Sequence, residues 1–406
     1  MSQNNEIIRF GSRGDGVTAD GRYVAGAVPG DMLIEQGGIK FGPGHQEPPC
    51  KHADICGGCQ MQHVTDGAYL GYLKDNIRGA LLSQGIDNID IKEPFLCNKH
   101  SRRRASFRAH WAGKKLLFGF NTQQSHRIIN LEQCLTITPA LWHVYLALKP
   151  FLNKYLPHKS AVIIKLTEVD QGVDLLIEGW LAEGLEQIEA ITDFAKNNKL
   201  ARISMDDGLG PVAMWEPEPV TINLDDIHTP FPPFSFLQAT RDGESALKAA
   251  VGLALQNIPV NVPVADLFAG LGTFSFYLAQ KHKVYAADAT LSAITNLKNT
   301  ANRAQLPIFT EHRDLYRRPL SSQELNRFKA VVIDPPRAGA RDQIEQICAS
   351  QLSDLAYVSC NPATFSRDAK LLIESGMELL WIQAVGQFRW STHVELVAHF
   401  KRKEVI

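Results

Sequence analysis

The chain lacks any long hydrophobic run. None of its 406 residues lies in a stretch that approaches the roughly 20 apolar residues of a membrane helix. The opening segment MSQNNEIIRF has no apolar centre of the kind that a signal peptide requires. Internal repeats and low-complexity segments are also absent from the sequence. We therefore expect a cytoplasmic protein with no membrane partner, and 45% apolar residues suffice for two to four packed domains.

The chain also lacks a large net charge of either sign. The 42 Lys and Arg residues balance 43 Asp and Glu, so any attraction to nucleic acid must be local. Residues 94–131 provide it, because they contain no acidic residue and interleave basic with aromatic side chains. Runs of charge are more often ordinary solvated faces, but phosphate neutralisation and base stacking are the two sequence-tolerant sources of RNA affinity. The candidate RNA-binding residues are Arg102, Arg103, Arg104, Phe107 and Arg108.

Cysteine is scarce, and its number is odd. Seven cysteines in a cytoplasmic chain argue against a disulfide framework and favour metal binding or catalysis. Three of them have the spacing C-x5-C-x2-C, and no histidine stands at ligand spacing. Four thiolates can hold either a [4Fe-4S] cluster or a zinc ion, and the spacing alone leaves both open. The candidate ligands are Cys50, Cys56, Cys59 and Cys134.

The pattern of predicted helices and strands changes along the chain. Residues 1–45 are Gly-rich with short apolar pieces, residues 46–92 hold three cysteines and one helix, and residues 93–225 alternate as a β-rich domain. After a Pro-rich link, residues 226–406 contain continuous apolar strands separated by amphipathic helices. This order predicts a doubly wound, mainly parallel α/β sheet. The short connection GQFRWST before the last strand predicts that this strand runs antiparallel.

The segment DLFAGLGTF, residues 266–274, follows the first of these strands and opens a helix. Gly270 and Gly272 let the backbone approach a ligand, and Asp288 ends the next strand, where a carboxylate can bind a ribose diol. The third glycine of a pyrophosphate-binding loop is absent, because residue 275 is serine. A plain tight turn would also explain two glycines. Together with Asp288 and Asp314, however, they favour adenosyl-methionine, which has no phosphate to bind.

Two later strands end in chemically capable residues. Asp334 begins DPPRAG, in which two prolines make the backbone rigid, and Cys360 lies in SCNP at the end of the next strand. Ligands bind outside the carboxyl ends of parallel strands, so we expect both side chains to face one crevice. A buried structural cysteine at a strand end is the alternative explanation of Cys360.

Taken in order, DLFAGLGTF, DPPRAG, SCNP and HVELVAHF resemble the RNA uracil-C5 methyltransferase family. The segment CKHADICGGCQMQH resembles the iron-sulfur branch of that family, which acts on 23S ribosomal RNA. The resemblance implies a class I adenosyl-methionine methyltransferase domain with a seven-stranded sheet. It also implies a mixed β domain with an iron-sulfur site, and a short N-terminal unit like the OB-fold TRAM domain.

The resemblance further implies the chemistry. A thiolate adds at uracil C6 and so activates C5 for methylation, after which a general base removes the C5 proton. Cys360 would be the nucleophile, Glu395 the base, and Asp334 would bind the uracil edge. The target base would have to be flipped out or lie in a loop. The residues expected to line adenosyl-methionine are Gln238, Phe268, Gly270, Gly272, Thr273, Asp288, Asp314 and Asp334.

For the four candidate ligand cysteines, the resemblance favours a [4Fe-4S] cluster over zinc. Four protein ligands would leave no iron open to the methyl donor, so we expect a structural role for the cluster. The implied partner is RNA, in particular 23S ribosomal RNA, and we expect the protein to act as a monomer.

Two other functions remain open from the sequence. DPPR also resembles the D/N-P-P motif of enzymes that methylate exocyclic amines, a reaction that needs neither Cys360 nor Glu395. A non-enzymatic iron-sulfur RNA-binding protein would need no methyl donor at all.

Overall fold

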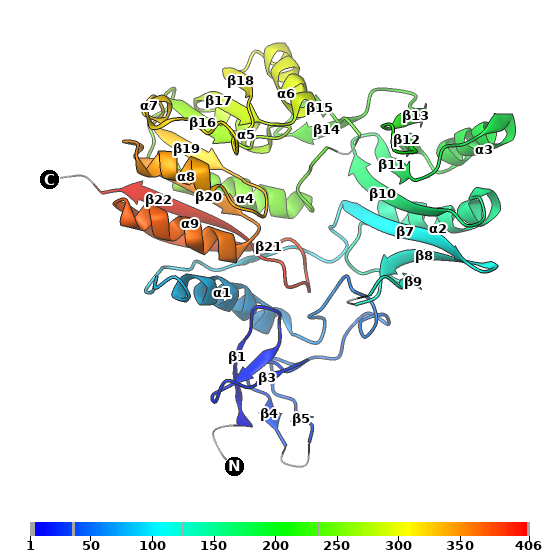
Figure 1. Ribbon diagram of the computed structural model, residues 1–406, viewed down its shortest axis with the longest axis horizontal. Helices are drawn as coiled ribbons and strands as arrows, with labels where there is room; N and C mark the ends of the chain where they lie inside the picture. The colour runs from blue at the N-terminus through cyan, green and yellow to red at the C-terminus, as the bar shows by residue number, and fades with distance from the viewer. Residues whose placement is uncertain (1–4, 35–36, 124, 234, 404–406) are drawn as a thin grey trace. The chain divides into compact units, whose positions relative to one another are not determined.

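The computed structural model describes residues 5–34, 37–123, 125–233 and 235–403. The chain divides into two compact units (Figure 1). Three of the four candidate ligand cysteines precede the predicted helix in the sequence, but the cysteines and the helix belong to different units. Unit 1 comprises Met1–Pro48, Met61–Cys97 and Asp242–Ile406, and unit 2 comprises Pro49–Gln60 and Asn98–Arg241.

Unit 1 is built on an eight-stranded sheet of order β18-β17-β16-β19-β20-β22-β21-β6. The five strands from β18 to β20 in this order are parallel, whereas β22 runs antiparallel to both of its neighbours. The doubly wound sheet and its antiparallel last strand are confirmed. The sheet has eight strands where seven were predicted, because the short β6 adds one. The strands are β6 (Phe95–Leu96), β16 (Pro263–Leu267), β17 (Lys283–Asp288), β18 (Ile308–His312), β19 (Ala330–Ile333), β20 (Asp354–Ser359), β21 (Met377–Gly386) and β22 (Glu395–Arg402).

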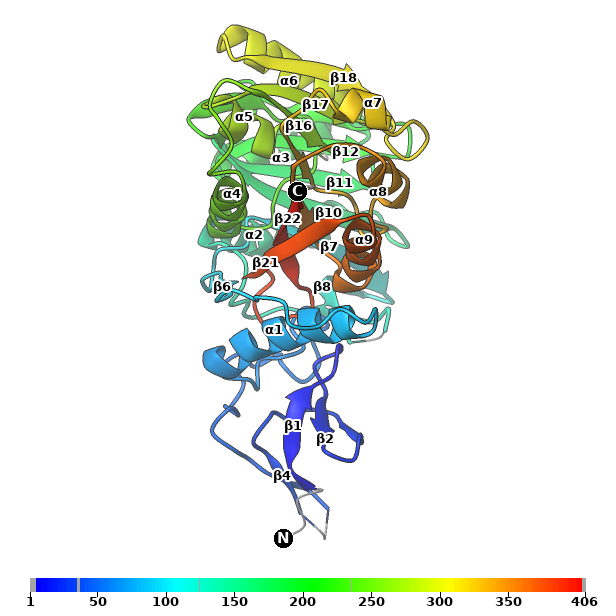
Figure 2. The same ribbon diagram turned by 90° about the vertical axis from the view of Figure 1, so that its left-hand side faces the viewer.

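Helices cover both faces of this sheet, with α4 and α5 on one side and α8 and α9 on the other (Figure 2). Because both faces are covered, the inner strands are apolar along their whole length, and every residue of β19 and β20 is buried. None of the helices in the described residues is both long and apolar enough to cross a membrane. The helices are α4 (Arg241–Ala254), α5 (Thr273–Ala279), α6 (Leu291–Arg303), α7 (Ser322–Leu325), α8 (Arg341–Cys348) and α9 (Pro362–Glu374).

The helix predicted after the cysteine-rich segment is α1 (Asp66–Leu82). Thr65 begins it, because its side chain accepts a hydrogen bond from the backbone N–H of Ala68. One apolar face packs into the core of unit 1. The buried residues of that face are those that the periodicity predicts, namely Tyr69, Tyr72, Leu73, Ile77 and Leu81.

The described N-terminal residues form two small antiparallel sheets. One has the order β1-β2-β3 and the other pairs β4 with β5. An isolated pair, Glu6 with Met32, joins the two sheets. The likeness to a TRAM domain stays a prediction. The strands are β1 (Ile7–Phe10), β2 (Gly16–Thr18), β3 (Tyr23–Val24), β4 (Met32–Leu33) and β5 (Ile39–Lys40).

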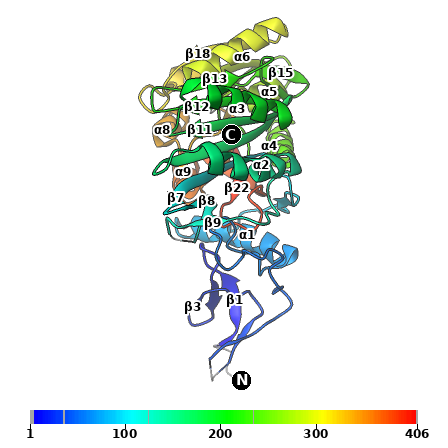
Figure 3. The ribbon, with the colours of Figure 1, turned by 90° about the vertical axis from the view of Figure 1, so that its right-hand side faces the viewer.

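Unit 2 contains a seven-stranded sheet of order β13-β12-β11-β10-β7-β8-β9, in which only the β11–β12 pair of the described strands is parallel. Two helices, α2 (Pro139–Tyr155) and α3 (Gly184–Asn197), lie over one side of it (Figure 3). Between helices and sheet lies a separate apolar core. The strands are β7 (Arg104–Ala112), β8 (Lys115–Asn121), β9 (Ile128–Asn130), β10 (Ala161–Val169), β11 (Gly172–Glu178), β12 (Leu200–Asp206) and β13 (Val212–Trp215), with a hairpin of β14 (Thr221–Leu224) and β15 (Ile227–Pro230) after them.

Candidate active site

The loop after β16 has a left-handed backbone at three positions. Phe268, Gly270 and Gly272 have φ values of 64°, 54° and 98°. Residues with a side chain rarely adopt the φ of 98° found at Gly272, so the backbone favours glycine at this start of α5, just before Thr273. The backbone N–H of Gly270 donates to Asp288 Oδ2 at 3.0 Å. The acidic end of β17 therefore holds the glycine loop in place.

Asp266, in β16, is a site residue that the sequence analysis missed. It is fully buried, and burial raises its pKa to about 7, with the charges of Asp334 and Asp288 adding to the effect. Ser275 Oγ donates to Asp266 Oδ2 at 2.5 Å. The serine that stands where a pyrophosphate loop has glycine therefore binds this carboxyl. The available signal was a charged residue inside an apolar strand.

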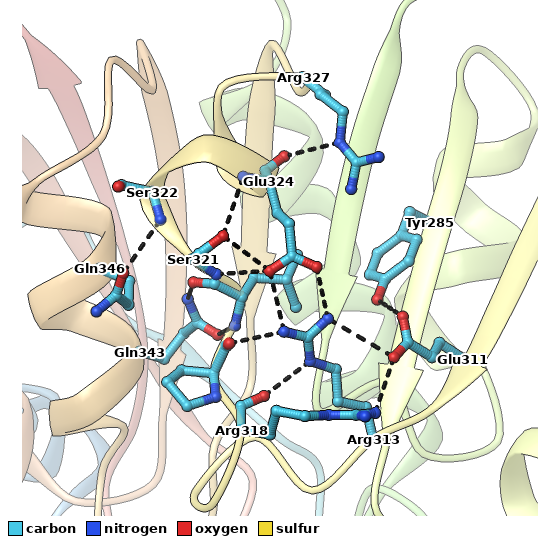
Figure 4. A network of polar contacts seen from close by, with 12 residues as sticks. Tyr285, Glu311, Arg313, Arg318, Ser321, Ser322, Glu324, Arg327, Gln343 and Gln346 are labelled. Atoms are coloured by element: carbon cyan, nitrogen blue, oxygen red, sulfur yellow. Dashed lines mark hydrogen bonds and ion pairs between the residues drawn. The ribbon is translucent and has the colours of Figure 1, made fainter.

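Asp314 lies in the loop after β18. A network of polar contacts holds this loop (Figure 4). The guanidinium of Arg313 donates to both oxygens of Glu324, at 2.8 and 3.0 Å. It also donates to the carbonyl oxygens of Arg318 and Pro319, each at 2.7 Å. These contacts fix both ends of residues 314–319 and hence the position of Asp314. The hydrogen bonds from Arg313 lower the pKa of Glu324 to about 2.

Three ionisable side chains meet where β19, β20 and β22 lie side by side. Ser359 of β20 pairs with Leu396 of β22, so the antiparallel register brings Cys360 opposite Glu395. Asp334 directly follows β19, the other neighbour of β20. The three predicted catalytic residues therefore lie together at one edge of the sheet.

Burial disfavours the charged form of all three groups. It raises the pKa of Cys360 to about 11, with the charges of Glu395 and Asp334 adding and that of Arg337 opposing. Burial also raises the pKa of Glu395 to about 8, with the Asp334 charge adding, and the pKa of Asp334 to about 7. Carboxyls with such pKa values can take up and release protons near neutral pH, as a general base must.

Gln238 and the arginine triplet lie together in unit 2. Arg103 donates from Nε to the carbonyl oxygen of Gln238 at 3.0 Å, and Arg104 donates from Nη1 to that of Leu237 at 2.6 Å. Gln238 and Arg103 are only 3% and 2% exposed. The triplet therefore fixes the backbone of the segment that carries Gln238.

This arrangement corrects part of the expected RNA surface. Phe107 is fully buried and packs against the rings of Phe118, Phe120 and Tyr145, so it is not free to stack on a base. Arg103 is buried as well. Side chains alternate across a strand, so Arg108, one residue after Phe107 in β7, is exposed.

The four candidate ligand cysteines all belong to unit 2. Burial raises the pKa of Cys56, and the nearby charges of Cys134 and Cys50 add to the effect. Burial lowers the pKa of Arg102, while the nearby charges of Cys134 and Cys59 act in the opposite direction. The four thiols are thus electrostatic neighbours. Within the described residues, no group of three or more His, Cys, Asp or Glu side chains is arranged to hold a metal ion, so the structure does not show the predicted iron-sulfur site.

Comparison with known proteins shows which family this chain resembles. The sequence profile of the family described as tRNA (uracil-5-)-methyltransferase matches residues 260–403. Over 397 residues the chain is 43% identical to an uncharacterized RNA methyltransferase of Zymomonas mobilis, covering 98% of this chain and 99% of that protein. Over 365 residues it is 30% identical to the 23S rRNA (uracil(1939)-C(5))-methyltransferase of Aliivibrio salmonicida, covering 88% of this chain and 82% of that protein.

A solved structure shares the fold. The tRNA (uracil-54, C5)-methyltransferase of Pyrococcus abyssi, in complex with S-adenosyl-L-homocysteine, superimposes with a TM-score of 0.70. The match covers 97% of this chain and 99% of that one at 21% identity. At this identity the likeness extends to the arrangement of elements only.

We expect Glu324→Gln to remove an acid-sensitive part of the stability. The folded-state pKa of Glu324 is about 2, below the ordinary 4.5. Its ionic contact therefore contributes fully above pH 4.5 and is lost as the pH falls toward 2. The variant should melt at a lower temperature than the wild type near neutral pH, and the difference should shrink at about pH 3.

The matched control is Glu374→Gln, which removes a surface carboxylate 4.0 Å from Lys370. Exposed pairs of this kind contribute little, so its melting temperature should follow that of the wild type at every pH. A Glu324→Gln difference that stays constant between neutral pH and about pH 3 would contradict the role of the Arg313 network.

Proposed function

Because the chain belongs to the RNA (uracil-5-)methyltransferase family, we propose that it transfers a methyl group from S-adenosyl-methionine to C5 of a uridine in RNA. The observation that carries the proposal is the meeting of Cys360, Glu395 and Asp334 at one edge of the sheet of unit 1. Membership of a methyltransferase family excludes the non-enzymatic RNA-binding alternative.

The proposed reaction begins at Cys360. The Cys360 thiol first gives its proton to water, and the thiolate Sγ adds to uracil C6. A C–S bond forms, and the electrons of the C5=C6 bond move to make an enolate that is nucleophilic at C5. The methyl donor supplies an electrophilic methyl group on a sulfonium and leaves as a thioether. Glu395 then takes the C5 proton, the C5=C6 bond reforms, and the C–S bond breaks to release the Cys360 thiolate. Asp334 binds the uracil edge throughout.

The charges around Cys360 suit a nucleophile that is activated only with substrates present. With a pKa of about 11, the thiol rests protonated at neutral pH. The positive charge of Arg337 favours the thiolate, and a sulfonium bound nearby would act in the same direction. Burial beside two carboxyls therefore limits side reactions of the free enzyme.

The proposed binding site for the methyl donor is the set of loops at the carboxyl ends of β16, β17 and β18. The positive-φ loop lets the donor approach the backbone, and Asp288 pins that loop through Gly270. Each Asp288 oxygen accepts one backbone hydrogen bond, Oδ2 from the N–H of Gly270 and Oδ1 from the N–H of Thr290. Each oxygen keeps a further lone pair that can accept a hydrogen bond from a ribose hydroxyl. The proposed contacts in unit 1 are Phe268, Gly270, Gly272, Thr273, Asp288, Asp314 and Asp334, and the role of Gln238, in unit 2, stays a prediction from the sequence.

We assign 23S ribosomal RNA as the substrate. The likeness to the Aliivibrio salmonicida enzyme and the four cysteines support this choice over transfer RNA. Arg108 is the proposed phosphate contact, because the sequence indicates it and because its side chain lies on the exposed side of β7. Methylation of an exocyclic amine has less support, because it would give the Cys360–Glu395 pair no role.

RNA containing 5-fluorouridine tests the reaction, because fluorine cannot leave C5 as a proton does. In the presence of the methyl donor, the wild type should form a denaturation-resistant adduct, and peptide mass mapping should place it on Cys360. Cys360→Ala should form none. Cys348→Ala, which removes a half-buried thiol of α8, should react like the wild type. An adduct formed by Cys360→Ala would refute the assignment.

Replacing the base tests the last step. Glu395→Gln should still add to uracil and transfer the methyl group but fail to remove the C5 proton, so a methylated covalent complex should accumulate. Turnover should fall by about a hundredfold or more, measured as 5-methyluridine released per enzyme. The control is Glu378→Gln at an exposed position of β21. Free turnover of Glu395→Gln at the wild-type rate would exclude Glu395 as the base.

We also propose that Cys50, Cys56, Cys59 and Cys134 hold a [4Fe-4S] cluster. The charges of Cys134 and Cys50 act on Cys56, and those of Cys134 and Cys59 act on the half-buried Arg102, whose positive charge would offset the thiolates. His52, two residues after Cys50, accepts the backbone N–H of Glu132 at 3.0 Å, so a hydrogen bond already joins the two cysteine-bearing segments. When bound, the cluster would staple these segments covalently.

Cys134→Ser should therefore lose iron and the visible absorbance of the cluster, and its melting temperature should fall. Iron and sulfide analysis of protein purified without oxygen measures the first effect. Cys348→Ser should keep both iron and stability. Retention of iron by Cys134→Ser would mean a different ligand, and zinc in place of iron in the wild type would contradict the cluster.

A further inference from the structure

The backbone of the loop after Asp334 is held by side chains from outside the loop. The carbonyl oxygen of Arg337 accepts two hydrogen bonds, from Asn361 Nδ2 at 3.0 Å and from Thr364 Oγ1 at 3.1 Å. The carbonyl of Gly339 accepts the hydroxyl of Tyr316 at 3.0 Å. Two of these three donors lie at the start of α9, since Asn361, directly after Cys360, is its N-terminal cap and Thr364 is in its first turn.

Asn361 does two things at once. Its Oδ1 accepts the backbone N–H of Ala363 at 3.2 Å and so caps α9, in which Pro362 takes the first position. Its Nδ2 faces the Arg337 carbonyl. Only this orientation of the amide satisfies both partners, because the reverse would set oxygen against a carbonyl and nitrogen against an N–H.

The contacts form a continuous path between the nucleophile and the base. Cys360 precedes Asn361, which holds Arg337. The guanidinium of Arg337 lies with Nη2 3.1 Å from Nδ1 of His393, two residues before Glu395. A shift of the loop would therefore change the relation of Arg337 to both reacting side chains.

On the basis of the proposed function, we propose that Asn361 and Thr364 form a latch. The latch positions the loop that carries Asp334 and Arg337 relative to Cys360. Asn361 and Thr364 are positioning residues, since they act through the loop and touch no substrate. The latch sets the step in which Cys360 adds to uracil. Its two bonds are made at Arg337, whereas the N–H of Asp334, which is also a proposed contact of the methyl donor, donates to the carbonyl oxygen of Leu267 in β16 at 3.2 Å. Asp334 is therefore held independently of the latch, and we expect binding of the methyl donor to stay unchanged. The members of the latch lie at the N-terminal cap and in the first turn of α9, whereas the proposed donor loops follow β16, β17 and β18.

Electrostatics give the latch a measurable consequence. The groups whose charges act on Cys360 are Glu395 and Asp334, which raise its pKa, and Arg337, which lowers it. The Cys360 charge in turn acts on the phenol of Tyr316. If the loop loosens, the favourable charge of Arg337 is held less firmly beside the thiol, and a higher pH is needed for the thiolate.

Three variants test the latch. Thr364→Val keeps the shape and removes the hydroxyl, and Thr364→Ser keeps the hydroxyl. Asn361→Ser keeps a capping oxygen but is too short to reach the Arg337 carbonyl. Ser366→Ala, which removes a hydroxyl of the same helix that donates to Ala363 instead, is the matched control.

The rate of adduct formation with 5-fluorouridine RNA should fall about five- to tenfold in Thr364→Val and Asn361→Ser, as expected for one lost hydrogen bond. Its pH profile should move to higher pH. Thr364→Ser and Ser366→Ala should match the wild type. Affinity for S-adenosyl-homocysteine, measured by calorimetry, should stay the same in all four variants. The melting temperature should fall by no more than about 2–4 °C in any of them, which is the effect of one lost hydrogen bond.

Wild-type adduct rates in both Thr364→Val and Asn361→Ser would overturn the latch and leave the proposed function intact. An equal loss in Ser366→Ala, or a parallel loss of S-adenosyl-homocysteine affinity, would assign the effect to general damage of α9 and also overturn it. A wild-type enzyme that forms no adduct would overturn the proposed function and the latch together.

Discussion

The reversed direction of β22 is the constraint on which the site depends. In a wholly parallel sheet, the first residue of this strand would lie at the edge opposite to the carboxyl ends of its neighbours. Because β22 runs antiparallel between β20 and β21, its first residue, Glu395, meets Cys360 just beyond the end of β20. The parallel strand β19 brings Asp334 to the same edge. One strand reversal thus places two carboxyls around one thiol.

That grouping is unfavourable in the resting protein. Burial raises the pKa of all three groups, and neighbouring like charges add to the effect for Cys360, whose pKa is about 11, and for Glu395, whose pKa is about 8. The surrounding loops are correspondingly well held. Arg313 fixes the Asp314 loop, Asp288 fixes the glycine loop, and the side chains of α9 fix the loop after Asp334. Strongly shifted groups on a rigid support are typical of catalytic sites.

The sequence predicts the parts of this structure whose cause is local. Continuous apolar strands and the periodicity of α1 depend on neighbouring residues, and motif residues at strand ends follow from topology. Period-two alternation along β7 separates the buried Phe107 from the exposed Arg108, whereas the run of charge does not distinguish the two faces of the strand. The contacts of Asp266 with Ser275 and of Arg313 with Glu324 join residues 9 and 11 positions apart through the tertiary fold, so no local pattern indicates them. The hydrogen bond from Asn361 to the carbonyl oxygen of Arg337 cannot be predicted from the sequence for the same reason.

The most direct test of the central claim is the titration of Cys360 itself. Alkylation of the Cys360 peptide, followed by mass spectrometry across a pH series, gives the pKa of this thiol in the wild type and after substitution of its neighbour. If β22 brings Glu395 opposite Cys360, the wild-type pKa lies well above that of a free cysteine, and Glu395→Gln lowers it, since a negative charge is removed. Identical titration curves for the two proteins would show that the carboxyl and the thiol are not neighbours and would contradict the account.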